Sequence, residues 1–144
     1  MKRSKFLFTL ATVAIIASMV LGACTTAPEQ PGETEPPQTG EELAVGIVLP
    51  TKDEPRWIQD ETRFKDALTQ QGYSVEILFS QGDPAREKQN VETLISKGIQ
   101  VLIICPHDGT AAAAAAETAR DAGVKVVAYD RLILDTDAVD YYVT

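Results

Sequence analysis

From residue 43 onward, short apolar runs alternate with longer stretches in which apolar residues recur at helical spacing. The apolar runs, each short enough for a β-strand, cover residues 43–49, 75–79, 99–105, 124–129 and 139–143. The helical stretches begin at Arg56, Pro84 and Gly109 and end at Gly72, Gly98 and Gly123. A glycine that ends a helix just before a strand is typical of a left-handed cap. The pattern therefore predicts five strands, with helices between the first four.

Strands and helices that alternate in this way favour a parallel sheet with helices on both faces, which is the doubly wound α/β fold class. Right-handed crossovers then bring every loop that follows a strand to one edge of the sheet. Ligands of such sheets bind outside the carboxyl ends of the strands. The segments expected to form a site are therefore 50–57, 80–84, 106–109 and 130–134.

The first 23 residues have the order of a secretory signal peptide. Three basic residues precede an apolar stretch over residues 6–21, and the small residues Gly22 and Ala23 follow it. The apolar stretch is too short and too poorly flanked for a stable membrane span. We therefore expect an exported protein whose signal ends at Ala23.

Cys24 follows this signal directly, and the string from Leu21 to Cys24 resembles a bacterial lipobox. That resemblance implies that the Cys24 thiol is diacylglycerylated, that the signal is cut before it, and that the new amino terminus is acylated. Several acyl chains would anchor the protein at the outer face of the cell membrane, since one chain alone binds only marginally. The alternative is an ordinary signal peptide in which Cys24 is incidental.

Residues 24–42 have the composition of a linker. They contain four prolines, five glutamates and no large apolar residue. Such a segment cannot bury enough apolar surface to offset the entropy that is lost on ordering. We expect an acidic, Pro-rich tether that holds a globular domain, residues 43–144, away from a surface. A merely disordered N-terminus is the alternative, and it predicts nearly the same composition.

The charge balance limits the partners of the mature chain. The chain carries 13 basic and 21 acidic residues, and the signal holds three of the bases and no acid. The remainder therefore has 10 basic against 21 acidic residues, a formal net charge of −11, which disfavours nucleic acid and anionic lipid as partners. With Cys24 lipidated, no disulfide is expected, and Cys105 is interpreted as a small buried hydrophobe at a strand end.

Polar side chains in the expected site loops suit an uncharged polyol. Asp130 and Arg131 follow the fourth strand, and this pair offers acceptors and a rigid fork of donors for neighbouring hydroxyl groups. Arg56 and Trp57 follow the first strand, and an indole can stack on the apolar face of a pyranose. The alternatives are a surface ion pair for the Asp-Arg motif and a core position for Trp57.

Four strings resemble the periplasmic sugar-binding proteins of the ribose, galactose and xylose type, above all the multiple-monosaccharide-binding and D-xylose-binding members. They are VGIVLPTKDEPRW (45–57), VETLISKGIQVLIICPHDG (91–109), GVKVVAYDRLI (123–133) and VDYYVT (139–144). The resemblance covers essentially all of residues 43–144. It implies a two-lobed solute-binding lipoprotein with the type I periplasmic-binding-protein fold. Such a receptor closes on an aldose (xylose, galactose, glucose or arabinose) and delivers it to an ABC permease.

The resemblance also implies which residues meet the sugar, and it implies no metal and no cofactor. The sugar-binding candidates carried over by motif and by loop are Arg56, Trp57, Asp130, Arg131, Lys52 and Asp108. Lys52 and Asp108 are the weaker candidates, because only their loops match. His107, the single histidine of the chain, is interpreted as a loop residue that faces water.

The chain ends at Thr144, where the first lobe of the family passes to a hinge and a second lobe. The resemblance therefore implies that residues 43–144 supply the N-terminal lobe only. In the family this lobe takes a strand and a helix back from the C-terminal part, so we expect an incomplete sheet with an uncovered edge. Such a fragment is expected to bind sugar weakly or not at all, and to be marginally stable and prone to aggregation.

Three other classes are weighed against transport. An enzyme is disfavoured because the chain has no glycine-rich phosphate loop, no GxSxG motif and no His/Cys cluster with metal spacing. Asp53, Asp108 and Asp130 lie at the expected edge, but nothing indicates the separation of two carboxylates that a glycosidase needs. A sugar-responsive transcription regulator is disfavoured by the export signal and by the lack of a DNA-reading headpiece. A receptor that reports sugar to a membrane signalling partner stays open.

Overall fold

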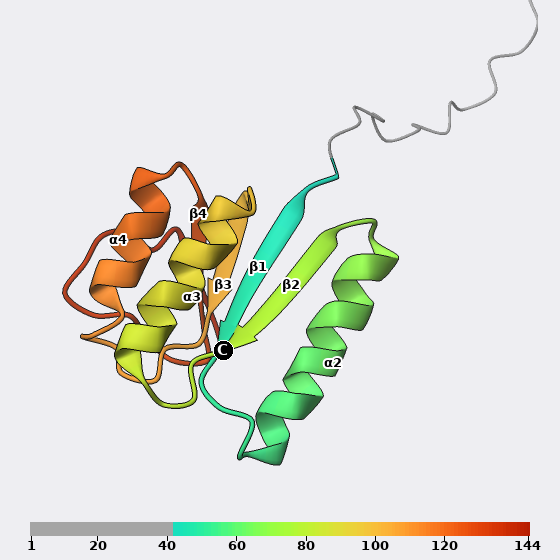
Figure 1. The fold of residues 1–144 in the computed structure, drawn as a ribbon, viewed down its shortest axis with the longest axis horizontal. Coiled ribbons are helices and arrows are strands. Elements are labelled where there is room, and N and C mark those ends of the chain that lie inside the picture. Colours follow the sequence, from blue (N-terminus) through green and yellow to red (C-terminus); the bar gives the residue numbers. More distant parts are fainter. Residues whose placement is uncertain (1–41) are drawn as a thin grey trace, which may run out of the picture. The chain divides into compact units, whose positions relative to one another are not determined.

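The computed structural model describes residues 42–144, which form one sheet with three helices (Figure 1). The strands are β1 (Ala44–Leu49), β2 (Ser74–Phe79), β3 (Val101–Ile104), β4 (Lys125–Tyr129) and β5 (Tyr141–Val143). The helices are α2 (Pro55–Gln70), α3 (Pro84–Ser96) and α4 (Ala113–Asp121). All neighbouring strands are parallel, and their spatial order is β2-β1-β3-β4-β5. The parallel α/β fold predicted from the sequence is therefore confirmed.

Helices cover both faces of this sheet because successive residues of a strand point to opposite faces. Ile47 of β1 packs with Trp57 of α2 in one apolar cluster. The next residue, Val48, belongs to a second cluster with Leu94 of α3 and Ala116 of α4. Helix α2 therefore lies on one face and helices α3 and α4 on the other, which is the doubly wound arrangement.

The strand order defines where a ligand is expected. The chain runs from β1 to β2 on one side and returns to β3 on the other side of β1. This reversal is a topological switch point, and ligands of open α/β sheets bind beside it at the carboxyl ends of the strands. The loops that follow β1, β3 and β4 therefore surround the expected site.

Helix α4 begins at Ala113, four residues later than the expected start at Gly109. The carboxylate of Asp108 accepts hydrogen bonds from the backbone N–H groups of Thr110 (2.9 Å) and Ala111 (2.8 Å). An Asp that bonds to its own following backbone favours a turn over a helix. The other strand and helix boundaries differ from the expected ones by no more than two residues at either end, which is the usual uncertainty of such limits.

The N-terminus of α3 is capped by Asp83, whose carboxylate accepts from the backbone N–H of Ala85 (2.8 Å) and Arg86 (3.4 Å). Replacing Asp83 by alanine is expected to lower the free energy of unfolding by about 0.5–2 kcal/mol, because these two donors lose their partner. Urea unfolding measures the change. Glu54 is the matched control, since it occupies the same position at α2 and makes no side-chain cap bond. Equal losses for Glu54→Ala and Asp83→Ala would contradict the capping role.

The sheet is least covered at β5. Tyr141 and Val143 are 68% and 52% exposed, so this three-residue strand adds little to the core of the described residues. The marginal stability expected for residues 43–144 stays a prediction.

Several features expected from the sequence lie outside the described residues. These are the signal peptide, the lipidated Cys24 and the tether as far as Glu41. Within residues 42–144, no helix combines the length and the apolar character that a membrane crossing requires.

Candidate functional site

Three of the expected site residues meet at the carboxyl edge of the sheet. Arg56 lies in the first turn of α2, just after the loop that follows β1. Asp130 and Arg131 follow β4 directly. A nitrogen of the Arg56 guanidinium, Nη2, is hydrogen-bonded and ion-paired to Oδ1 of Asp130, across 74 residues of sequence. The pairing with Asp130 holds the pKa of Arg56 above its usual value.

The backbone at Asp130 has an unusual conformation. Its φ is 63°, and the N–H of Arg131 donates to the carbonyl oxygen of Tyr129 at 2.7 Å, which closes a three-residue turn. Such γ-turns with positive φ are rare and strained. Strand β5 supports this turn with two hydrogen bonds: the Asp130 N–H donates to the Val143 carbonyl, and the Tyr142 hydroxyl donates to the Asp130 carbonyl. Backbone strain that the surrounding structure maintains in this way is frequent at ligand sites.

Trp57 occupies the core position that the sequence left open as the alternative to a sugar contact. Its side chain is only 1% exposed and packs in the core with Ile47 and Leu49. The guanidinium carbon of Arg56 lies 4.5 Å from a ring centroid of the indole, and that of Arg131 lies 5.3 Å from it. The indole is therefore covered by two cations and has no open face for a pyranose. The packing therefore favours the core alternative, in which Trp57 is the apolar support of both arginines.

Arg131 is held by a second contact. Its Nη1 donates to the backbone carbonyl of Pro106 in the loop after β3, at 3.2 Å. Together with the indole contact, this bond joins the loops that follow β1, β3 and β4. The group Arg56, Asp130 and Arg131 is hereafter called the arginine–aspartate group.

Lys52 and Asp108 are engaged elsewhere. The Nζ of Lys52 lies 4.5 Å from the ring centroid of Phe79 and 3.9 Å from a carboxylate oxygen of Glu61. Asp108 binds the backbone of its own turn, as described above. Within residues 42–144, neither side chain forms a hydrogen bond or ion pair with the arginine–aspartate group.

His107 lies on the same edge, and its ring packs against Gly82. A Cβ built on Gly82 would lie 3.4 Å from Cε1 of the imidazole. The residue as a whole is exposed, as expected for a loop position. The contact brings the loop after β3 against the loop after β2.

Two buried carboxylates at this edge escaped the sequence analysis. Asp60 of α2 is 5% exposed and Glu87 of α3 is 1% exposed. Asp60 stands four residues after Arg56 in the helix, a spacing that brings side chains together, so its pairing with Arg56 could have been foreseen. No comparable signal marked Glu87, because an acidic residue near the start of a helix is usually solvated and favours the helix dipole.

Glu87 joins two of the loops. Its Oε2 accepts from the backbone N–H of His107 at 3.0 Å and from the hydroxyl of Ser80 at 3.4 Å. Burial raises the pKa of Glu87, although both of these hydrogen bonds act in the opposite direction. The bond to His107 fixes the chain next to Pro106, the residue whose carbonyl holds Arg131.

The raised pKa of Glu87 has a predictable effect on stability. Folding favours the protonated carboxyl group of Glu87. Its contribution to the free energy of unfolding is therefore fully present below the pKa of the unfolded state, about 4.5, and is lost as the pH rises through the pKa of the folded state. The stability of the wild type relative to Glu87→Gln, measured by urea unfolding, is therefore expected to fall as the pH rises above about 4.5. Glu92→Gln, at an exposed position of the same helix, is the control. A pH-independent difference between the wild type and Glu87→Gln would contradict the prediction.

Cys105 is fully buried at the end of β3, as the sequence indicated. Burial raises the pKa of its thiol to about 12, so the thiol is protonated near neutral pH and is a poor nucleophile. No group of three or more potential metal ligands is found within residues 42–144.

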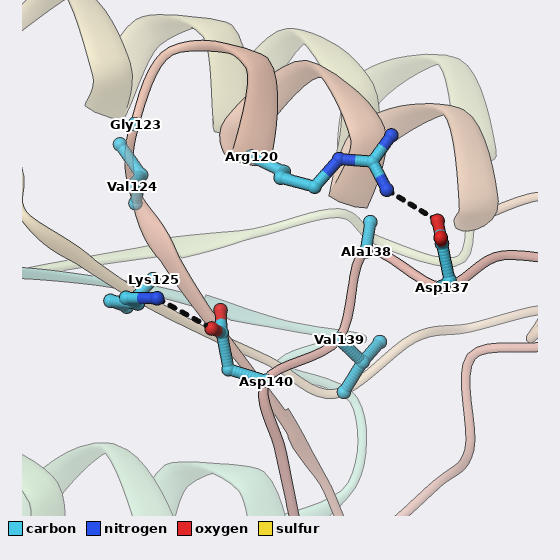
Figure 2. Close-up of a pocket in the computed structure, with 8 residues that line it drawn as sticks. All are labelled: Arg120, Gly123, Val124, Lys125, Asp137, Ala138, Val139 and Asp140. Atoms are coloured by element: carbon cyan, nitrogen blue, oxygen red, sulfur yellow. Dashed lines mark hydrogen bonds and ion pairs between the residues drawn. The ribbon is translucent and has the colours of Figure 1, made fainter.

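One cavity within residues 42–144 lies at the opposite edge of the sheet, beside the start of β4 (Figure 2). It has a volume of about 140 Å³. Its charged residues pair with one another: Arg120 with Asp137, and Lys125 with Asp140 at 2.8 Å. These charges are already paired with one another. The two ion pairs attach the segment before β5 to α4 and to the start of β4. The arginine–aspartate group stays the candidate site.

Comparison with known proteins identifies the family. A family model described as "Periplasmic binding protein domain" matches residues 45–144. The chain is 41% identical over 100 residues to the multiple sugar-binding periplasmic receptor ChvE of Rhizobium radiobacter, covering 69% of this chain and 28% of the relative. It is 37% identical over 111 residues to the multiple sugar-binding periplasmic protein SbpA of Azospirillum brasilense, covering 77% and 31%.

Solved structures agree with this match. The carbohydrate transporter solute-binding protein of Chloroflexus aurantiacus, in complex with D-glucose, is 80% identical with a TM-score of 0.68 and covers 73% of this chain and 31% of that one. An ABC transporter solute-binding protein of Clostridium phytofermentans with bound β-D-glucose is 36% identical with a TM-score of 0.66, covering 69% and 31%. The chain thus spans just under a third of the length of these proteins. It belongs to the periplasmic binding protein family, and the four relatives above are sugar-binding or solute-binding proteins.

Proposed function

We propose that residues 43–144 form the N-terminal lobe of the sugar-binding component of an ABC importer, and that the ligand is an aldose, with D-glucose the first candidate. The observation that carries the proposal is the arginine–aspartate group, in which the first turn of α2 and the loop after β4 meet at the carboxyl edge of the sheet, and the loop after β3 holds Arg131. The D-glucose in the Chloroflexus aurantiacus protein, 80% identical over the matched region, supports the choice of sugar.

The chemistry of this group suits neighbouring hydroxyls of an uncharged sugar. The Asp130 carboxylate accepts hydrogen bonds only, and the two guanidinium groups donate only, so together they serve both halves of a hydroxyl's bonding capacity. Hydrogen bonds to charged groups are about twice as strong as neutral ones. In this proposal a second lobe closes over the sugar, removes water, and supplies the remaining contacts, after which the sugar passes to the permease.

Binding of monosaccharides by the full-length gene product tests this function. The coding sequence downstream of the Thr144 codon is read first, so that the protein prepared is the whole product. Calorimetric titration with D-glucose, D-galactose, D-xylose and L-arabinose is expected to give saturable binding, tightest for D-glucose. Recovery of the sugar and of offered glycosides without chemical change would separate a binding protein from a glycosidase. Absence of saturable binding to all four sugars would overturn the proposal.

We extend the proposal to the N-terminal part, where residues 1–23 are a lipoprotein signal, Cys24 carries the lipid and residues 24–42 are the tether. The order of basic, apolar and small residues before Cys24 supports this division. Metabolic labelling with radioactive palmitate in the native host is expected to label the wild type and not Cys24→Ser. Labelling of Cys24→Ser to the same extent would contradict the lipid anchor.

A further inference from the structure

Asp60 is a charged residue inside the described lobe. Its side chain is 7% exposed, between α2 and β4. The Tyr129 hydroxyl donates a hydrogen bond to Oδ2 of Asp60 at 3.1 Å. The Nε of Arg56 lies 3.6 Å from the same oxygen, and Nη1 of Arg63 lies 3.5 Å from the other. A buried carboxylate is costly unless its partners compensate, so the partners of Asp60 indicate what it does.

Arg56 lies between two carboxylates that approach different atoms of its guanidinium. Asp60 approaches Nε, and Asp130 binds Nη2. The guanidinium is planar and rigid, so two fixed partners on different nitrogens define the orientation of its whole plane. The Trp57 ring limits the same group from a third direction. Without such contacts a side chain as exposed as that of Arg56, at 52%, would sample many rotamers.

Asp130 is the partner that a sugar would engage, because it also belongs to the proposed site. The carboxylate oxygens of Asp60 are engaged by Tyr129, Arg56 and Arg63, all from the protein itself. Asp60 therefore differs from Asp130 in its role toward Arg56: it can hold the guanidinium while Asp130 exchanges a protein partner for sugar hydroxyls. We infer that Asp60 is a positioning residue for the sugar site, which orders Arg56 before the ligand arrives. The inference rests on the proposed sugar-binding function.

Tyr129 and Arg63 are the other two partners of Asp60. Tyr129 links Asp60 to the site, whereas Arg63 does not. Tyr129 lies directly before the Asp130 turn, and it makes an edge contact with Phe64 at 5.0 Å between ring centroids. Its hydrogen bond therefore ties Asp60 to the strand that carries the site. Arg63 is on the solvent side, with a side chain that is 74% exposed, and within residues 42–144 it forms no ion pair with the arginine–aspartate group. Arg63→Ala is thus a control that removes one partner of Asp60 without touching Arg56.

A double-mutant cycle on D-glucose binding tests the inference. Asp60→Asn keeps an acceptor for the Tyr129 hydroxyl and removes the charge that holds Arg56. It is expected to weaken binding by the full-length product about 3- to 10-fold, the usual cost of ordering one long side chain on binding. In an Arg56→Ala background the same change is expected to have no further effect, and Arg63→Ala is expected to bind as the wild type does. Equal losses from Asp60→Asn in both backgrounds would overturn the inference while the proposed function stood.

A measurement without sugar keeps the inference testable if Asp60→Asn fails to fold. In ¹⁵N-labelled Asp130→Asn protein, Asp60 is the remaining carboxylate beside Arg56. The Nε–Hε signal of Arg56 is expected to stay resolved and protected from exchange with water in that variant. If the Nε–Hε signal of Arg56 exchanged with water as fast as that of free arginine, the inference would be overturned. If the wild type binds none of the four sugars, the proposed function fails, and the positioning role fails with it.

Discussion

Replacing Trp57 by alanine is expected to lower the free energy of unfolding by about 3–5 kcal/mol, the usual cost of truncating a large buried aromatic side chain. The indole is the largest fully buried side chain within residues 42–144. It fills the space between α2 and β1, and it also supports the guanidinium groups of Arg56 and Arg131. The change therefore removes core packing and the floor of the proposed site together. Urea unfolding measures the loss of stability.

Trp57→Phe separates the packing of Trp57 from its polar atom. Among the described residues, the indole nitrogen of Trp57 is buried and has no hydrogen-bond partner. Phenylalanine keeps an aromatic ring under the two arginines and removes this unsatisfied donor, so its cost is expected to be well below that of alanine. If Trp57→Phe lowered the free energy of unfolding as much as Trp57→Ala does, an aromatic ring beneath the guanidinium groups would not account for the stabilising effect of Trp57.

The arrangement of the strands could be predicted because local signals agreed with one another. Gly72, Gly98 and Gly123 all adopt φ near 80° at the ends of helices, as their positions before apolar runs indicated. The late start of α4 reflects the local turn at Asp108, which the helical pattern did not reveal, and a contact between distant segments accompanies it. Gly109 accepts a hydrogen bond from the N–H of Leu134, and a Cβ on Gly109 would overlap the carbonyl oxygen of Leu132.

The sequence predicted which polar residues lie at the carboxyl edge of the sheet. It predicted less well which of these side chains contact one another. Topology alone placed Arg56 near Asp130, since both follow strands that end on the same side. Periodicity could not tell whether Trp57 faced a ligand or the core, because the answer depends on two arginines, one of them 74 residues away. The burial of Glu87 likewise depends on a backbone donor 20 residues later, which no helical pattern reveals.

Asp130→Asn is expected to weaken D-glucose binding by the full-length product about 10- to 100-fold, since hydrogen bonds to a charged group contribute roughly 1.5–3 kcal/mol. Asparagine keeps the size of the side chain and tolerates the left-handed backbone that Asp130 adopts at φ 63°. The γ-turn is therefore expected to survive, and the free energy of unfolding to change little. Calorimetric titration with D-glucose and urea unfolding measure the two effects.

Asp130→Ala distinguishes the charge of this residue from its backbone conformation. Alanine removes the carboxylate and also strains the turn, because an L-residue without a short polar side chain costs about 1–2 kcal/mol in the left-handed region. Both variants are expected to lose affinity, and Asp130→Ala is expected to lose stability as well. If Asp130→Asn bound D-glucose as the wild type does, the carboxylate would not be a ligand of the sugar, and Asp130 would serve only to turn the chain and pair with Arg56.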